Sequence, residues 1–530
     1  MFDVLIRNGR VVDGTGNPWT MADVGVKQGR IARVGMLAGE SADRIIDGSG
    51  LIVSPGFIDI HSHSDFTLLV NPRAESKVRQ GVTTEVVGNC GSSAAPVEKR
   101  FREYLEKWVT PLLGGAKLNY DWTTMGDYLE RLDHEKISLN VASYVGHGTV
   151  RIVAMGFDDR DPTRSELKEM ERLVEEAMLG GAFGLSSGLV YSPGCYAKTG
   201  ELISLAKVAV KFGGIYASHI RDEGDALIES VNEAIEIGER ASIPVQISHH
   251  KATLPRNFGK VKETLKNIEE ARGRGVDVTF DQYPYVAGSS GLTYLLPHWS
   301  LEGGIEKLLD RLRSPALRMK IRRDMKGKGP GWEDVLLAYC QRSKDLEGKT
   351  IAQAAESRRA DPYDLVFDLL LADEAAVTIV LFTMSEEDVE AVMRSPFMMV
   401  GSDGRAVAPY APLSSGKPHP RYYGTFVRLL GRYVRERKVL TLESAIRKMT
   451  SFTASRLGLF DRGLVKEGMW ADLALFDSES VLDRATFAEP HQYASGVEYV
   501  IVNGEVVVER GNHTGARSGR VLRGAGYADR

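Results

Sequence analysis

The sequence is short of cysteine, of long apolar runs and of concentrated positive charge. Its 530 residues include three cysteines, too few for a disulfide framework. No apolar run is long enough to span a bilayer, and the N-terminus, "MFDVLIRNGRVVDG", lacks the long apolar region of a signal peptide. The formal net charge is −4 and no basic block stands out, which argues against a nucleic-acid partner. We therefore expect a cytoplasmic protein without a membrane or nucleic-acid partner.

The bulk composition is that of an ordinary globular protein. Hydrophobic residues make up 43% of the chain and charged residues 26%. Because 530 residues exceed what one hydrophobic core normally holds, we expect one large domain and a smaller one. The 55 glycines predict many tight turns. Nothing in the sequence indicates an oligomeric state.

The two ends of the chain have a similar sequence pattern. Residues 1–54 and 460–530 contain short β-branched strands with turn dipeptides, as in "LIRNGRVVDG" near the start and "VIVNGEVVVERG" near the end. Since chain termini tend to lie close together, these two segments predict one small composite β-domain.

Residues 55–459 alternate strand and helix patterns. Repeated βα units predict a parallel sheet, and eight of them predict a TIM (β/α)8 barrel, an α/β fold. Nine candidate strands compete for eight places, because "AVTIVLFTM" also has a strand pattern. We expect one of the nine to be extra or to belong to an insertion, which we place at about 284–349.

A short stretch of the first barrel strand, "GFIDIHSHSDF", carries the strongest functional signal. Phe57, Ile58 and Ile60 predict a buried strand, and His61 and His63 follow two residues apart. At that spacing both rings point to the same side of the strand. Two imidazoles there suit a metal ion or a polar cleft and suit a packed core badly.

Other polar residues stand at the ends of later predicted strands. Cys90 ends the second, His219 the fifth, the pair His249 and His250 the sixth, and Asp403 the eighth. Barrel active sites lie at the carboxyl ends of the strands, so these side chains are expected to converge. Sulfur, imidazole nitrogen and carboxylate oxygen are the ligands of Zn²⁺, which lowers the pKa of a bound water to about 7. Asp403 could then take and return the proton.

Each of these residues alone has a structural alternative. A lone cysteine at a strand end is usually a small buried hydrophobe, and a single buried histidine is usually a hydrogen-bonded structural residue. The two adjacent histidines face opposite sides of their strand, so at most one easily points inward. We choose His249, with His250 as the alternative. The whole constellation favours a metal site.

At this point the sequence resembles the amidohydrolase superfamily, and within it the N-acyl-D-amino-acid deacylases (D-aminoacylases). The resemblance covers nearly the whole chain and rests on "GFIDIHSHSD", "GVTTEVVGNCG", "GLSSGLVYSPGCYAKTGEL", "YASHIRDE", "ISHHK", "FDQYPY", "GSDG", "HPRYYGTF" and "TGARSGRVLRG". It implies a TIM barrel with a small β-sandwich built from both chain ends, and an insertion over the active site. The implied activity is zinc-dependent hydrolysis of the linear amide of an N-acyl-D-amino acid to a D-amino acid and a carboxylate.

The resemblance also implies residue roles. A tight zinc site is implied for Cys90, His219 and His249, and a second, weaker metal position for His61, His63 and Asp403. Asp403 is the implied acid/base. Arg421 is the implied partner of the substrate's α-carboxylate, which fits the guanidinium fork, and the neighbouring substrate-binding residues are Tyr283 with Ser289 or Ser290. Tyr191 and Lys251 resemble pocket residues, with a structural role as an equal alternative.

Two other readings stay open. Hydantoinases and dihydroorotases of this superfamily, which act on cyclic amides, use a carboxylated lysine from the fourth strand as a metal bridge. Here that strand, "GAFGLSSGLVY", has no lysine, and Cys90 takes the bridging place. The second alternative is a non-catalytic scaffold that has lost its ligands, against which the complete ligand set argues.

The first segment of the insertion bears on the substrate's side chain. "VAGSSGLTYLLPHW", from Val286 to Trp299, contains no lysine or arginine to pair an acidic side chain. It offers apolar and aromatic residues instead: Leu292, Tyr294, Leu295, Leu296 and Trp299. We therefore expect a preference for hydrophobic D-residues. The alternative is that these residues pack the insertion against the barrel.

Overall fold

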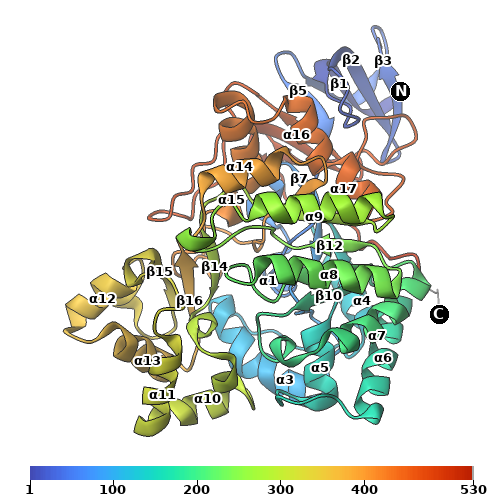
Figure 1. Ribbon diagram of the computed structural model, residues 1–530. Helices are drawn as coiled ribbons and strands as arrows, with labels where there is room; N and C mark the ends of the chain where they lie inside the picture. The colour runs from blue at the N-terminus through green and yellow to red at the C-terminus, as the bar shows by residue number, and fades with distance from the viewer. Residues whose placement is uncertain (528–530) are drawn as a thin grey trace.

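A computed structural model of the protein describes residues 1–527, apart from the side chains of Trp108, Pro111 and Leu112. Strands and helices alternate through its middle, so the prediction of an α/β fold is confirmed (Figure 1).

The middle of the chain is built on two parallel sheets. The first has the order β6-β7-β8 and the second the order β17-β13-β12-β11-β10-β9. The single residue Tyr144 separates β8 from β9. Their strands are β6 (Phe57–Asp59), β7 (Val82–Val87), β8 (Asn140–Ser143), β9 (Val145–Gly146), β10 (Gly184–Gly188), β11 (Ile215–His219), β12 (Val245–Ile247), β13 (Val278–Gln282) and β17 (Met398–Val400).

Helices connect these parallel strands. They are α1 (Thr67–Val70), α2 (Glu75–Val78), α3 (Lys99–Tyr104), α4 (Met125–Glu135), α5 (His147–Met155), α6 (Arg164–Leu179), α7 (Thr199–Ala209), α8 (Leu227–Ala241), α9 (Val261–Gly273) and α14 (Glu386–Arg394). After β17 come α15 (Arg421–Arg428), α16 (Leu442–Met449) and α17 (Ser451–Arg456). Capping boxes at Thr124 and Thr163 start α4 and α6, because each threonine side chain and the acid three residues later satisfy free N–H groups.

The parallel strands have a different apolar cluster on each face. Ile58, Val86, Tyr144 and Met399 belong to a small cluster that draws on β6, β7, the β8–β9 junction and β17. Neighbouring strand residues such as Phe57 belong instead to the large cluster that the helices cover. This two-sided burial is why these strands are apolar along their whole length.

The two ends of the chain form one sheet of nine strands. Strand β18 (Leu473–Phe476), from the C-terminal part, pairs antiparallel with β5 (Ile52–Pro55), and β5 pairs parallel with β1 (Phe2–Val11). The other strands are β2 (Thr20–Lys27), β3 (Arg30–Gly35), β4 (Ala42–Asp47), β19 (Val497–Val502), β20 (Glu505–Glu509) and β21 (Asn512–His513). Residues from both ends share one apolar core on this sheet.

A segment between β13 and β17 folds around a core of its own. It contains an antiparallel sheet of order β14-β16-β15, with β14 (Gly288–Gly291), β15 (Val335–Cys340) and β16 (Val377–Leu381). Its helices are α10 (Ile305–Arg313), α11 (Pro315–Met325), α12 (Ile351–Arg358) and α13 (Pro362–Ala372), which stand apart at the lower left of Figure 1. The ninth candidate strand is therefore β16, and it lies outside the parallel sheets. Because β16 completes this sheet and its core, the segment extends beyond residue 349.

A buried lysine joins the first parallel strand to the last. Lys77 Nζ donates to Asp59 Oδ2 at 2.7 Å and to Ser402 Oγ at 2.7 Å, and Glu85 Oε2 lies 3.5 Å away. Ser402 follows β17, and its backbone N–H and hydroxyl both donate to Asp59. An isolated parallel bridge between Ser62 and Gly404 extends this contact.

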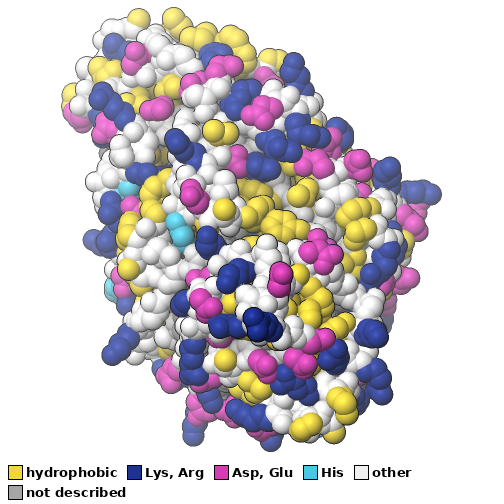
Figure 2. Space-filling view, turned by 90° about the vertical axis from the view of Figure 1, so that its left-hand side faces the viewer, with side chains coloured by type: hydrophobic (Ala, Val, Ile, Leu, Met, Phe, Trp, Pro, Cys, Tyr) yellow, Lys and Arg dark blue, Asp and Glu magenta, His cyan; other side chains and the backbone are white. Residues whose placement is uncertain are grey.

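On the face shown in Figure 2, basic and acidic side chains are interspersed among apolar patches. Within residues 1–527, no helix combines the length and the apolar character that crossing a bilayer requires.

The Lys77 network predicts a large loss of stability on substitution. In Lys77→Met, Asp59 and Glu85 would stay buried without their cation, and removing one partner of such a group typically costs about 3–5 kcal/mol. We expect a clear fall in the urea midpoint, followed by circular dichroism. The matched control is Lys198→Met, whose exposed ion pair with Asp161 contributes little. Equal midpoints for the two variants would contradict this role of Lys77.

Candidate metal centre

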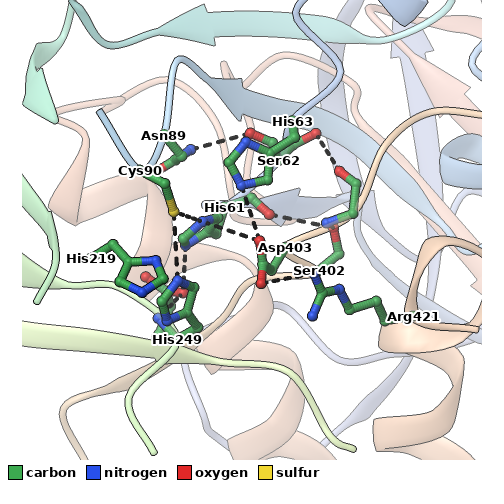
Figure 3. Close-up of polar contacts among 12 residues, drawn as sticks. His61, Ser62, His63, Asn89, Cys90, His219, His249, Ser402, Asp403 and Arg421 are labelled. Carbon is green, nitrogen blue, oxygen red and sulfur yellow. Dashed lines mark hydrogen bonds and ion pairs between the residues drawn. The ribbon is translucent and has the colours of Figure 1, made fainter. Parts of the chain in front are cut away.

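The polar residues that the sequence places at strand ends meet in the structure. His61 and His63 follow β6, Cys90 follows β7 and His219 ends β11. His249 and Asp403 follow β12 and β17 and complete the set. Figure 3 shows these side chains pointing toward one another from different strands. All six thus lie at the carboxyl ends of parallel strands.

Short distances link the donor atoms. Cys90 Sγ lies 3.3 Å from His61 Nε2 and 3.5 Å from His249 Nε2. Asp403 Oδ1 lies 3.0 Å from His63 Nε2 and 3.6 Å from His61 Nε2. The rings of His219 and His249 have centroids 4.2 Å apart. Cys90 therefore lies between the histidines of two strands, as a bridging ligand would.

Two overlapping groups of residues could each hold a metal ion. One is His61, Cys90, His249 and Asp403, and the other is His219, Glu223 and His249. Within each group the donor atoms lie within 4.8 Å of one another. His249 belongs to both. The geometry thus groups Cys90 with His61, whereas the resemblance puts Cys90 with His219. His63 is in neither group but touches Asp403, and its side chain is 24% exposed.

The adjacent residues His249 and His250 direct their rings to different surroundings. The ring of His249 faces His61 and His219. The ring of His250 points away from the cluster, where its Nε2 lies 2.9 Å from Thr264 Oγ1 on α9. Both residues follow the end of β12, and the left-handed backbone at His249 turns its ring into the cluster.

Two carboxylates that the sequence reasoning missed orient the histidine rings. His249 Nδ1 lies 2.9 Å from Glu223 Oε1, and His61 Nδ1 lies 3.0 Å from Asp281 Oδ1. With Nδ1 donating to a carboxylate, each ring directs Nε2 toward the cluster, the arrangement common around metal-bound histidine. The signal was present in the motifs: Glu223 follows His219 by four residues in "YASHIRDE", and Asp281 precedes Tyr283 by two in "FDQYPY".

The backbone at three of the clustered residues is strained. Cys90, His249 and Asp403 have φ values of 53°, 34° and 48°, in the left-handed region that residues other than glycine rarely adopt. Such conformations cost about 1–3 kcal/mol each and concentrate at functional sites. Here the strain turns each side chain into the cluster immediately after its strand ends.

The environment favours the ionised forms of the anionic members. Burial opposes ionisation of Asp403, but the Arg421 guanidinium beside it holds the pKa of that carboxyl well below its usual range. Burial likewise opposes the Cys90 thiolate, but His61 and His249 hold the pKa of the thiol well below its usual range. A thiolate and a carboxylate are the forms that bind a metal ion.

His219 supports a metal ligand in its own right. Its side chain is 6% exposed, and neither ring nitrogen has a hydrogen-bond partner in the described part of the chain. Buried polar atoms are nearly always paired, so an unpaired imidazole facing other donors calls for a ligand. Sulfur, nitrogen and oxygen donors in this cluster fit zinc.

Arg421, the first residue of α15, contacts the cluster at Asp403. Its Nη2 lies 2.9 Å from Asp403 Oδ2 (Figure 3). Its guanidinium lies over the Tyr283 ring, 4.7 Å from the ring centroid. Its Nε and Nη1 are buried without hydrogen-bond partners. Unpaired guanidinium donors of this kind are suited to an anionic partner such as a carboxylate.

The remaining predicted substrate residues also lie at this site. The rings of Tyr191 and His219 have centroids 4.9 Å apart, and the Tyr191 hydroxyl is 3.5 Å from Ser290 Oγ. Ser289 donates its hydroxyl to Ile379 O on β16. Lys251 Nζ is engaged by Glu223 and by the backbone oxygen of His249.

Two cavities meet at the cluster. One, of about 460 Å³, is lined by His63, Cys90 and Arg421 among others, and the other, of about 750 Å³, by His219, His249 and Lys251 among others. Both are lined by Asp403, Tyr191, Ser289 and Ser290. A molecule bound at Asp403 could thus extend into both cavities.

Comparison with known proteins fits this geometry. Residues 44–508 match the Amidohydrolase family. The N-acyl-D-glutamate deacylase of Alcaligenes xylosoxydans xylosoxydans is 38% identical over 98% of this chain and 96% of its own, and the D-aminoacylase of the same organism is 38% identical over 98% and 97%. The structure of the N-acyl-D-glutamate deacylase from Bordetella bronchiseptica, complexed with zinc and a phosphonate mimic of the tetrahedral intermediate, has a TM-score of 0.84. It is 35% identical, covering 98% of this chain and 99% of that one.

The chain belongs to the amidohydrolase family, and its nearly full-length likeness to these proteins places it with the D-aminoacylases of that family.

The ligand roles that the family resemblance implies predict different zinc contents for three variants. Cys90→Ala and His219→Ala should each strip the tightly held zinc, since three protein ligands with a water are the usual catalytic shell. His61→Ala should retain that zinc and weaken a second position. Zinc per chain after dialysis, measured by inductively coupled plasma mass spectrometry, tests this. Equal zinc loss in all three variants would mean that this division of the ligands into a tight and a weak position is wrong.

Proposed function

We propose that this protein is a zinc-dependent hydrolase that cleaves the amide bond of N-acyl-D-amino acids, giving the D-amino acid and a carboxylate. The observation that carries the proposal is the position of Asp403, which contacts His63 of the metal cluster on one side and Arg421 on the other. Relatives that match nearly the whole chain are named for this reaction.

The proposed tight zinc ligands are Cys90, His219 and His249, and the second, weaker position uses His61, His63 and Asp403. A zinc ion bound there would polarise the acyl oxygen and acidify a water.

The residues of the chain supply the rest of the mechanism. The unpaired donors of Arg421 hold the α-carboxylate, with the ring of Tyr283 packed against the guanidinium. Tyr191, Ser289, Ser290 and Lys251 line the space around the amide. Asp403 accepts the proton of the attacking water as the tetrahedral intermediate forms. It then donates that proton to the leaving amine, which otherwise would depart as an unstable amide anion.

The architecture that goes with this function is a TIM barrel at residues 55–459 with a small β-sandwich from residues 1–54 and 460–530. The contact between the ends of β6 and β17, together with the unbroken order of the other parallel pairs, supports ring closure. The joint sheet of both chain ends and its single core support the sandwich. The insertion begins at about 284, and the pairing of β16 extends it past 349, to about 382.

The alternative functions have less support. A cyclic-amide hydrolase of the hydantoinase type would need a bridging lysine on the fourth strand, and β10 reads Gly-Leu-Ser-Ser-Gly. A non-catalytic scaffold would not need three strained backbone positions that aim ligands at one point. Bound zinc together with turnover of a linear N-acyl-D-amino acid would contradict both the cyclic-amide hydrolase and the non-catalytic scaffold.

We propose the cytoplasm as the location. Cys90, Cys195 and Cys340 are all free thiols. A reducing compartment keeps Cys90 available as a thiolate ligand.

The structure bears on the expected preference for hydrophobic D-residues. Tyr294, Leu295 and Leu296 line the larger cavity. Leu292 and Trp299 line neither cavity and belong to the insertion's own core. Of the cations that line this cavity, Lys251 is paired with Glu223, Arg221 with Glu233 and Arg256 with Asp225, and Lys328 also lines it. The proposed preference therefore rests on three residues.

We expect Asp403→Asn to keep its tight zinc and to lose about 10²–10⁴-fold in kcat, because the amide cannot accept the proton. Zinc content and kcat are measured on the same preparation. Asp388→Asn is the matched control, since Asp388 is also buried but only accepts hydrogen bonds from the Gly259 N–H, remote from the cluster. Near-normal turnover by Asp403→Asn would remove Asp403 from the mechanism.

A substrate panel tests the side-chain preference. N-acetyl-D-leucine should have a higher kcat/KM than N-acetyl-D-glutamate or N-acetyl-D-aspartate. Burying an apolar side chain contributes about 1.5–3 kcal/mol, while an unpaired buried carboxylate costs more than that. The L-enantiomers serve as controls for stereochemistry. A higher kcat/KM for either acidic substrate would contradict the preference.

A further inference from the structure

The smaller cavity continues from the metal centre into an apolar arm. Close to the centre its lining includes Cys90 and Asp403. Six large apolar side chains line it as well, and we call them the apolar arm: Phe101, Tyr104, Ile152, Phe157, Leu301 and Ile305. They play no part in binding the metal, the α-carboxylate or the proposed side-chain pocket.

Three separate elements enclose the arm. Phe101 and Tyr104 come from α3, Ile152 from α5 and Ile305 from α10. Helix α3 packs on α5, and Figure 1 shows it between α5 and the inserted helices. An ion pair between Lys107 and Glu306 ties the segment after α3 to α10.

The walls of the arm are uncharged. The described residues of α3, α5 and α10 that line the cavity are Phe101, Tyr104, Gly148, Thr149, Ile152 and Ile305. The rings of Tyr104 and Phe157 pack against each other with centroids 5.5 Å apart. An apolar occupant is the chemistry that such walls favour, because contact removes its surface from water.

The positions of Arg421 and of the proposed side-chain pocket indicate which part of the substrate enters the arm. An N-acyl amino acid extends on two sides of its amide: the Cα side carries the carboxylate and the side chain, and the other side carries the acyl chain. Lys251, Tyr283 and Leu295 line the larger cavity and not the smaller one. Arg421 lines the smaller cavity, but its guanidinium lies over the ring of Tyr283, which lines the larger one, so the carboxylate is held where the two cavities meet. With the carboxylate at this junction, the amide at Asp403 and the side chain in the larger cavity beside Leu295, as proposed above, the acyl chain enters the smaller cavity.

We propose that the apolar arm is an acyl-chain site and that the enzyme prefers N-acyl-D-amino acids with medium-length apolar acyl groups to their N-acetyl analogues. The inference rests on the proposed deacylase function. Water adds its oxygen to the acyl carbon, the C–N bond breaks, and the proton that Asp403 carries goes to the amine. The products are a fatty carboxylate and a free D-amino acid.

A chain-length series on the zinc-loaded full-length enzyme tests the proposal. The substrates are the N-acetyl, N-butanoyl, N-hexanoyl and N-octanoyl forms of one D-amino acid, the one whose N-acetyl form is turned over best. Full burial of a methylene corresponds to roughly a three- to fourfold gain in kcat/KM. We expect at least about a tenfold rise from acetyl to octanoyl, allowing for partial burial.

Variants on two walls of the arm separate this site from the rest of the pocket. Ile152→Phe on α5 and Ile305→Trp on α10 fill the arm and should each lower the ratio of octanoyl to acetyl kcat/KM at least about fivefold, the equivalent of one or two buried methylenes. Leu295→Phe is the control: it lines only the larger cavity, so the same ratio should stay within about twofold of the wild-type ratio. Two wall variants keep the test valid if one of them fails to fold.

Negative results would separate a wrong acyl-chain site from a wrong deacylase function. Intact N-acetyl turnover with a kcat/KM that falls as the chain lengthens would overturn the acyl-chain site and leave the deacylase function standing. A ratio that neither wall variant changes would overturn it as well. Absence of turnover at every chain length would contradict the proposed function itself, and this inference with it.

Discussion

The Lys77 ammonium group, buried between Asp59 and Ser402, is the contact on which the geometry of the site depends. It ties the end of β6 to the end of β17, the first and the last of the parallel strands in chain order. The neighbouring backbone bonds are Asp403 N–H to His61 O at 2.7 Å and His63 N–H to Gly404 O at 3.0 Å. The backbones of His61, His63 and Asp403 are thus held by hydrogen bonds next to the buried ion pair of Lys77 and Asp59. A buried pair of this kind contributes specificity of register more than net stability.

The strained backbone at Cys90, His249 and Asp403 depends on the same scaffold. A residue other than glycine stays in the left-handed region only where its surroundings over-determine it. His249 has its N–H bonded to Asp281 and its ring bonded to Glu223, and Asp403 is bonded through its N–H and its carboxylate. Hydrogen bonds thus compensate for the strain, and the side chains gain a fixed direction. Fixed ligands reduce the reorganisation that metal binding or catalysis would otherwise require.

The sequence predicts which residues form the site better than it predicts which groups orient them. Period-two spacing identifies His61 and His63, and strand-end position identifies Cys90 and Asp403, because both rules depend only on strand geometry. The roles of Glu223, in a loop, and Asp281, on β13, could not be assigned, since only tertiary contacts bring their carboxylates to a ring nitrogen. The extra strand could not be identified either: β16 is as apolar as the parallel strands because it packs in a second core. Leu292 and Trp299 illustrate the same difficulty, as burial in a core and exposure to a pocket select the same residue types.

Charge balance explains why one metal position would be tight and the other weak. With Cys90 as a thiolate, the cluster and the residues that orient it hold four anions: Cys90, Asp403, Glu223 and Asp281. Two cations, Lys251 and Arg421, are in direct contact with them, and histidines that bind a metal ion are neutral. Buried charges need compensation, and two negative charges remain uncompensated. One divalent ion supplies that compensation. A second ion would bring two positive charges into a site already neutral, and it would compete with Arg421 for Asp403, so its binding is opposed by the same electrostatics that favour the first.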